Sequence, residues 1–132
     1  MTDPIKLIGN VASPYTRKMV AYLRYKRIPY EVIWGQPEDV LKKINIEPPK
    51  PILLPVFILD RDGQATAVTD STPLIREFEE KYSDRSVLPK DPALNFINFV
   101  LEDFGDEWCT KFMFHYRCCL LYTSDAADDL RG

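Results

Sequence analysis

The sequence predicts an α/β fold in which a β-α-β-α-β-β-α domain is followed by a partial all-α segment. Three observations predict this class. Short apolar runs bounded by turn residues are typical of strands. Between them, segments that open with proline and carry apolar residues three or four positions apart indicate short helices. A polar stretch at residues 83–91 then separates this alternation from a longer helical pattern.

The expected elements follow one another closely. We expect strands at residues 5–8, 31–34, 56–59 and 67–69, and helices at residues 15–27, 37–44 and 71–82. Residues 60–63, Asp-Arg-Asp-Gly, predict the turn of a hairpin. The cations of the first helix are expected on its solvated face: Arg17, Lys18, Arg24 and Arg27. The expected core includes Leu7, Val32, Val56, Ile58 and Leu74.

These patterns predict a first domain at residues 1–82, a linker at 83–91, and the truncated start of a helical second domain at 92–117. The aromatic residues from Phe96 to Tyr116 are expected in the core of that second domain, and His115 is interpreted as a packed side chain. Residues 118–132 are expected to be an artefactual tail, because residues 119–129 match the translation of a transposase adapter used in shotgun sequencing. The alternative is a natural acidic tail.

Composition excludes several classes of function. The 132 residues carry a net charge of -3, which provides no basic field for nucleic acid. No apolar run is long enough to cross a membrane, and the first residues lack a signal peptide's features. Cys109, Cys118 and Cys119 match neither a disulfide framework nor a zinc spacing. We therefore expect a cytoplasmic protein with no metal and with neither nucleic-acid nor membrane partners.

The most informative stretch is Ser13-Pro14-Tyr15-Thr16, directly after the first predicted strand. Ser13 can cap the next helix, and Pro14 fits its first turn, where a backbone N–H would be unpaired. The free N–H groups and the helix dipole favour an anion beside the Ser13 hydroxyl, whether thiolate, phosphate or carboxylate. Ser13 can also be a helix cap only.

Two further motifs lie at element junctions. Leu54-Pro55 precedes the third strand, where a trans proline is an ordinary first residue. Asp70-Ser71 lies between the fourth strand and the third helix, where an ordinary N-cap is one interpretation. With the Ser13 motif and the element order, these junctions resemble the thioredoxin-like N-terminal domain of glutathione transferases over residues 5–82. Residues 92–117 resemble the start of the family's all-helical second domain.

The resemblance implies a four-stranded mixed sheet flanked by three helices, with glutathione as co-substrate. Its sulfur would accept a hydrogen bond from the Ser13 hydroxyl, with Asn10 and Tyr15 as alternative partners. Related glutaredoxins carry cysteines where this chain has Ser13 and Thr16. Because dithiol exchange needs a thiolate nucleophile, that chemistry is excluded at this site.

The resemblance also assigns the other two motifs. The Leu54 backbone would pair with the cysteinyl part of glutathione, next to a cis Pro55. Ser71 would hold the γ-glutamyl carboxylate, and Asp70 would face the γ-glutamyl ammonium. The chain departs from the family at residues 50–53, which are less polar than usual, and at Asp70, which replaces the commoner glutamate.

For the full-length parent protein, the resemblance implies a cytoplasmic detoxification transferase that is a homodimer and acts on a small electrophilic substrate. The alternative is a non-catalytic module for protein interaction or glutathione sensing. Most of the family's second domain would be missing from this chain. We therefore expect apolar side chains of the second domain to be exposed and to promote aggregation: Ile97, Val100, Leu101, Phe104, Phe112 and Phe114.

Overall fold

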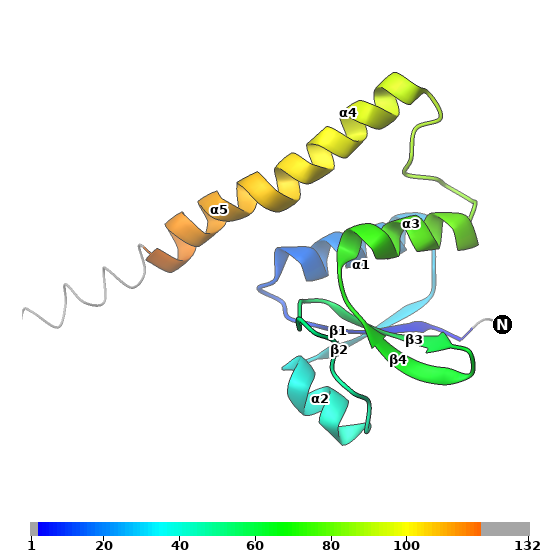
Figure 1. Ribbon diagram of the computed structural model, residues 1–132, viewed down its shortest axis with the longest axis vertical. Coiled ribbons are helices and arrows are strands. Elements are labelled where there is room, and N and C mark those ends of the chain that lie inside the picture. The colour runs from blue at the N-terminus through cyan, green and yellow to red at the C-terminus, as the bar shows by residue number, and fades with distance from the viewer. Residues whose placement is uncertain (1–2, 120–132) are drawn as a thin grey trace, which may run out of the picture. The chain divides into compact units, whose positions relative to one another are not determined.

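The computed structural model describes residues 3–119 (Figure 1). The predicted tail therefore lies largely outside the described residues, from position 120 onward. The chain divides into two compact units, residues 1–87 and residues 88–132.

The first unit is built on a four-stranded mixed sheet, as predicted. Its strands are β1 (Ile5–Gly9), β2 (Tyr30–Trp34), β3 (Val56–Arg61) and β4 (Gln64–Val68), in the order β2-β1-β3-β4. Strands β1 and β2 are parallel, with Leu7 opposite Val32. Strand β3 is antiparallel to both neighbours, with Phe57 opposite Leu7 on one side and Val68 on the other.

Helices cover both faces of the sheet. Helices α1 (Pro14–Lys26) and α3 (Ser71–Lys81) lie on one face, and α2 (Pro37–Lys43) lies on the other (Figure 1). The β-α-β-α-β-β-α order is confirmed.

The core differs from the prediction because the sheet separates it into two clusters. Leu7 and Leu74 pack in the α1–α3 cluster, whereas Val56 packs in the α2 cluster. Val32 and Ile58, expected inside, are only partly buried at the margins of these clusters. The division into two clusters follows from the strand period of two, which sends neighbouring side chains to opposite faces of the sheet.

The hairpin is tighter than predicted. Strands expected at 56–59 and 67–69 extend to Arg61 and from Gln64, so only Asp62 and Gly63 remain between them. Both have positive φ, at 55° and 82°. Such a two-residue turn matches the twist of the flanking strands, and the ladder therefore continues up to it.

The second unit is helical. Helix α4 (Pro92–Asp103) is followed by a π-helical segment (Phe104–Trp108), helix α5 (Cys109–Met113) and a second π-helical segment (Phe114–Cys119). Asp91 caps α4 by accepting a hydrogen bond from the Leu94 N–H at 2.9 Å.

Many large apolar side chains among the described residues of this unit are exposed, as predicted for six of them: Ile97, Val100, Leu101, Phe104, Phe112 and Phe114. Phe96 and Tyr116 are exposed as well. The aromatic core expected for a complete second domain stays a prediction. His115 is exposed too, with its ring against that of Tyr116. A helical period creates an apolar face but does not supply the surface that covers it. Within residues 3–119, no helix has the length and apolar character to cross a membrane.

Candidate functional site

Three chain segments meet at one edge of the sheet. Strand β1 ends there at Gly9, β3 begins there at Val56, and β4 ends there at Val68, as the pairing of Ile8 with Val56 and of Phe57 with Val68 requires. Each of the three segments carries one of the predicted motifs. The structure therefore brings Ser13, the Leu54–Pro55 bond and the Asp70–Ser71 pair to the same edge.

Ser13 is the N-cap of α1. Its Oγ accepts a hydrogen bond from the Thr16 N–H at 3.2 Å, and Pro14 is the first helical residue. A serine hydroxyl has one donor and two acceptor positions, so capping uses only an acceptor. Among the described residues, none accepts a hydrogen bond from the half-buried Ser13 hydroxyl. The cap interpretation is confirmed, and a donor remains for a ligand.

The loop before Ser13 is held by its own polar groups. The Asn10 N–H donates to Thr16 Oγ1 at 3.3 Å, and the Ala12 N–H donates to Asn10 Oδ1 at 2.8 Å. Arg17 Nε donates to the Val11 carbonyl at 3.0 Å. Asn10 thus already braces the loop through its side chain. Tyr15 is half-buried and remains an alternative partner for a ligand sulfur.

The Leu54–Pro55 peptide bond is cis, as predicted, and Pro55 is buried. The Lys50–Pro51 bond is also cis, which the sequence did not indicate. Leu54 is half-buried. The neighbouring Leu53 carbonyl accepts a hydrogen bond from Thr69 Oγ1 at 2.7 Å. This bond joins the loop before β3 directly to the junction that carries Asp70.

Asp70 caps α3 from an unusual backbone conformation. Its carboxylate accepts a hydrogen bond from the Thr72 N–H at 3.3 Å, and its φ and ψ are 82° and 114°. Non-glycine residues adopt such angles at a cost of about 1–3 kcal/mol, and they concentrate at functional sites. Ser71 follows as the first residue of α3 and is only 7% exposed.

Helices α1 and α3 lie side by side with their N-termini at this edge. Three residues of α1, spaced four apart, contact α3 in order. Lys18 Nζ lies 3.3 Å from Ser71 Oγ, the Tyr22 hydroxyl donates to Glu79 at 2.8 Å, and Lys26 Nζ lies 2.9 Å from Glu79. The prediction that Lys18 belongs to a solvated face is therefore wrong: it is half-buried between the helices.

Lys26 is a second cation that sequence reasoning missed, and it is 5% exposed. Its partner Glu79 also accepts hydrogen bonds from Ser86 Oγ and from the Val87 N–H. Burial alone would raise the pKa of the Glu79 carboxyl, but the bonds from Ser86, Lys26 and Tyr22 hold that pKa below its usual value. Burial and the Glu79 carboxylate raise the pKa of Tyr22 far above its usual value. The spacing of residues 18, 22 and 26 is the signal that could have revealed this stripe.

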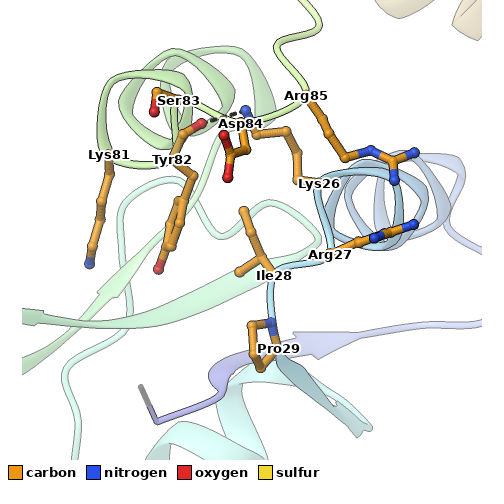
Figure 2. Close-up of a pocket in the computed structure, with 9 residues that line it drawn as sticks. All are labelled: Lys26, Arg27, Ile28, Pro29, Lys81, Tyr82, Ser83, Asp84 and Arg85. Carbon is orange, nitrogen blue, oxygen red and sulfur yellow. Dashed lines mark hydrogen bonds between the residues drawn. The ribbon is translucent and has the colours of Figure 1, made fainter. Parts of the chain in front are cut away.

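A hollow of about 640 Å³ lies at the opposite end of the two helices, lined by residues 26–29 and 81–85 (Figure 2). The Lys26 ammonium at its border is bonded to the Tyr82 carbonyl (Figure 2). None of the predicted site residues lines this hollow. Within the described part of the chain, no cluster of three or more His, Cys, Asp or Glu residues could hold a metal ion.

Comparison with known families agrees with the geometry. A family model described as glutathione S-transferase, N-terminal domain, matches residues 7–86. The chain belongs to the glutathione S-transferase family. Among curated proteins, none matches this transferase-family chain.

Several solved glutathione S-transferases are similar to it. An enzyme from Methylobacterium radiotolerans, in complex with glutathione sulfonate, is 28% identical over 71% of this chain and 42% of its own, with a TM-score of 0.58. One from Ceriporiopsis subvermispora, in complex with glutathione, is 26% identical over 88% and 52%, with a TM-score of 0.57. A Tau class enzyme from mango, Mangifera indica, is 25% identical over 85% and 50%, with a TM-score of 0.63. The chain thus spans about half the length of these relatives.

Proposed function

We propose that this chain binds glutathione at the edge formed by Ser13, Leu54, Pro55, Asp70 and Ser71. In a full-length transferase, this site would activate the glutathione thiol for attack on a small electrophile. The observation that carries the proposal is the state of Ser13: its oxygen caps α1, and its O–H donor has no acceptor among the described residues. A donor at a helix N-terminus favours an anion such as a thiolate.

The proposed chemistry assigns a task to each group. The Ser13 O–H donates to the sulfur and stabilises the thiolate, while the thiol proton is released to solvent. The thiolate then forms a carbon–sulfur bond with the electrophile, and the leaving group departs with its bonding electrons. The Leu54 backbone holds the cysteinyl part, and the buried cis Pro55 fixes the direction of that backbone.

Two of the similar solved transferases support the ligand, because they contain glutathione or glutathione sulfonate. The junction chemistry of this chain is consistent with it. The α3 N-terminus offers N–H groups to a carboxylate at Ser71, and the exposed Asp70 carboxylate can meet an ammonium.

Ser13→Ala tests the proposal through the ionisation of bound glutathione. Removing one hydrogen bond to a thiolate should raise the pKa of the bound thiol by about one to two units, since such a bond contributes about 1.5–3 kcal/mol. The measurement is the pH dependence of thiolate ultraviolet absorbance for saturated protein. Ser13→Thr, which keeps the hydroxyl, is the matched control. An unchanged pKa in Ser13→Ala would reduce Ser13 to a helix cap and transfer the role to Tyr15 or Asn10.

Turnover separates the enzyme from the alternative, a binding or sensing module. If a full-length parent conjugates a model electrophile, Ser13→Ala should lower its turnover by about ten- to a hundredfold, the kinetic equivalent of that hydrogen bond. Saturable glutathione binding without any turnover would instead favour the non-catalytic module.

A further inference from the structure

The hollow at the C-terminal ends of α1 and α3 has an excess of positive charge. Its lining holds the carboxylate of Asp84 and three exposed cations: Arg27, Lys81 and Arg85. Within residues 3–119, none of these three cations forms a hydrogen bond or an ion pair through its side chain. The fourth cation of the lining, Lys26, is buried in an ion pair. The hollow therefore retains positive charge that the described residues do not neutralise.

The two helix ends account for only part of this charge. The C-terminus of a helix carries about half a negative elementary charge and attracts cations. The ends of α1 and α3 together offset about one of the three exposed cations on this basis, and the Asp84 carboxylate offsets a second. The third cation has no counter-charge, so an anion entering the hollow is attracted.

Two of the cations are arginines in the left-handed backbone conformation. Their φ angles are 58° at Arg27 and 54° at Arg85. The other non-glycine residues with positive φ in the described part of the chain are of the types that adopt it most readily: Asn45, Asp62 and Asp70. Arg27 is the C-cap of α1, where left-handed residues are usually glycine. Arginine at both positions costs backbone energy that glycine would avoid, and strain of this kind concentrates at functional sites.

The two arginine side chains are placed to act together. Figure 2 shows both of them extending to the same side of the hollow. The Arg85 guanidinium carbon lies 4.7 Å from the centre of the Tyr25 ring. Stacking on a ring uses the flat face of a guanidinium, whereas its N–H groups lie in its plane and stay free to donate. Tyr25 thus orients Arg85 without using the donors that a bidentate bond to an oxyanion needs.

Apolar side chains complete the lining. Ile28 is 5% exposed, Pro29 follows it, and the half-buried Tyr82 ring lies across from the arginines (Figure 2). At about 640 Å³, the hollow has the size of a small-molecule site. Its chemistry therefore fits a ligand that has an apolar body and one anionic end.

We propose that this hollow binds a small molecule that carries a phosphate monoester on a flat apolar body. The phosphate accepts hydrogen bonds from Arg27 and Arg85, and the body packs on Ile28 and Tyr82. A phosphate monoester has three acceptor oxygens and a charge of about −1.5 to −2 at pH 7, so it can bond to both guanidinium groups at once. A carboxylate has two oxygens and matches only one of them. The site is separate from the proposed glutathione site.

Titration calorimetry on the full chain tests the proposal with three probes. Phenyl phosphate has both parts, inorganic phosphate lacks the apolar body, and benzoate has a carboxylate in place of the phosphate. Arg27→Gly and Arg85→Gly remove the cations and suit the positive φ, so thermal melting should show little loss of stability. Arg76→Gln removes an exposed cation of α3 outside the hollow and is the matched control.

Phenyl phosphate should bind saturably and about tenfold more tightly than either of the other probes. Each arginine variant should weaken it by about tenfold, the loss of one charge-assisted hydrogen bond. Arg76→Gln should leave its affinity unchanged, and Asp84→Asn should increase it, because a repelling carboxylate is removed. Added salt should weaken binding, since the cations are exposed. Glutathione should not compete, because its proposed site lies at the other end of the helices.

A folded chain without saturable phenyl phosphate binding would overturn the inference, and so would an affinity that is unchanged in both arginine variants. Equal affinity for benzoate would refute the phosphate assignment, and equal affinity for inorganic phosphate would refute the role of the apolar lining. Displacement of phenyl phosphate by glutathione would show one shared site instead of two. Asp84→Asn, which changes affinity in the opposite direction, keeps the test decisive if an arginine variant folds poorly. Failure of phenyl phosphate to bind leaves the proposed glutathione function unaffected.

Discussion

The buried ion pair at one end of the α1–α3 pair and the Ser13 site at the other end differ in whether their polar groups are already paired within the protein. At the C-terminal end, Lys26 and Glu79 form an ion pair whose side chains are 0% and 6% exposed, and Tyr22 completes it. At the N-terminal end, Ser13 retains a hydrogen-bond donor, and Asp70 is exposed with a positive φ. The closed network satisfies itself and stabilises the fold. The open end has groups left for a ligand, which is why we assign glutathione binding to it.

The largest expected effect comes from breaking the closed end. Lys26→Met leaves the Glu79 carboxylate buried without its cation, and the free energy of unfolding should fall by about 3 kcal/mol. Lys18→Met, on the same helix at the open end, should cost less than about 1 kcal/mol. Urea denaturation followed by circular dichroism measures both.

The double variant Lys26→Met/Glu79→Gln sharpens this test, because it removes both charges and keeps an amide oxygen that can accept the hydrogen bonds now made to Glu79. It should recover most of the stability lost in Lys26→Met. Stability losses that simply add would show that the two charges are not coupled. Glutathione affinity per folded molecule should be the same in Lys26→Met as in the unmodified chain.

A smaller loss of stability is expected from a change at Gly9, the last residue of β1, at the open end. A Cβ added at Gly9 would collide with the Thr16 Cγ2 methyl, which is buried under the first turn of α1. Gly9→Ala should therefore lower the free energy of unfolding by about 1–3 kcal/mol through overpacking. Thermal and urea unfolding measure it.

Thr16→Ser removes the colliding methyl and keeps the hydroxyl that accepts from Asn10. The variant Gly9→Ala/Thr16→Ser should consequently be more stable than Gly9→Ala alone. If the pair is no more stable, the close approach of α1 to β1 is not what requires glycine at this position.

The smallest effect is a pH dependence of stability at the closed end. Because the pKa of Glu79 is lowered in the folded state from an ordinary value of 4.5, its stabilising contribution is complete above that value. It should be lost as the pH falls through the lowered folded-state pKa. Unfolding free energies measured from neutral to acidic pH should fall less steeply in Glu79→Gln. An identical slope in both proteins would exclude Glu79 as a source of acid sensitivity.

Local patterns predicted the order of elements and the Ser13 cap, because both depend on residues close in the sequence. The cis Pro55 was implied by the family resemblance and not by the local pattern. Local patterns missed the contacts of Lys18 and Lys26 with residues of α3 and its C-terminal end. Those contacts depend on how α1 aligns with a helix more than fifty residues away, and helical periodicity does not determine that alignment. The second cis bond, at Pro51, had no distinguishing local signal.

A comparison of the two units shows the same limit: sequence patterns predict an element but not what packs against it. The apolar period of α4 predicted a helix, and Asp91 caps it as its position before Pro92 suggests. Phe96 in the second unit is 68% exposed, whereas Phe57 in β3 is fully buried. Phe57 is covered by helices that pack on its face of the sheet. Phe96 lies on α4, and its side chain has no such cover among the described residues. Aggregation of the purified chain through these exposed residues stays a prediction.

The most direct test of the assignment of binding to the open end is a glutathione titration followed by backbone amide NMR. The account predicts saturable shifts, with one dissociation constant, at Thr16, Leu54 and Ser71, and no shift at Lys26 or Arg85 beside the opposite hollow. Shifts confined to residues 26–29 and 81–85, or no saturable shift at the three open-end amides, would contradict it.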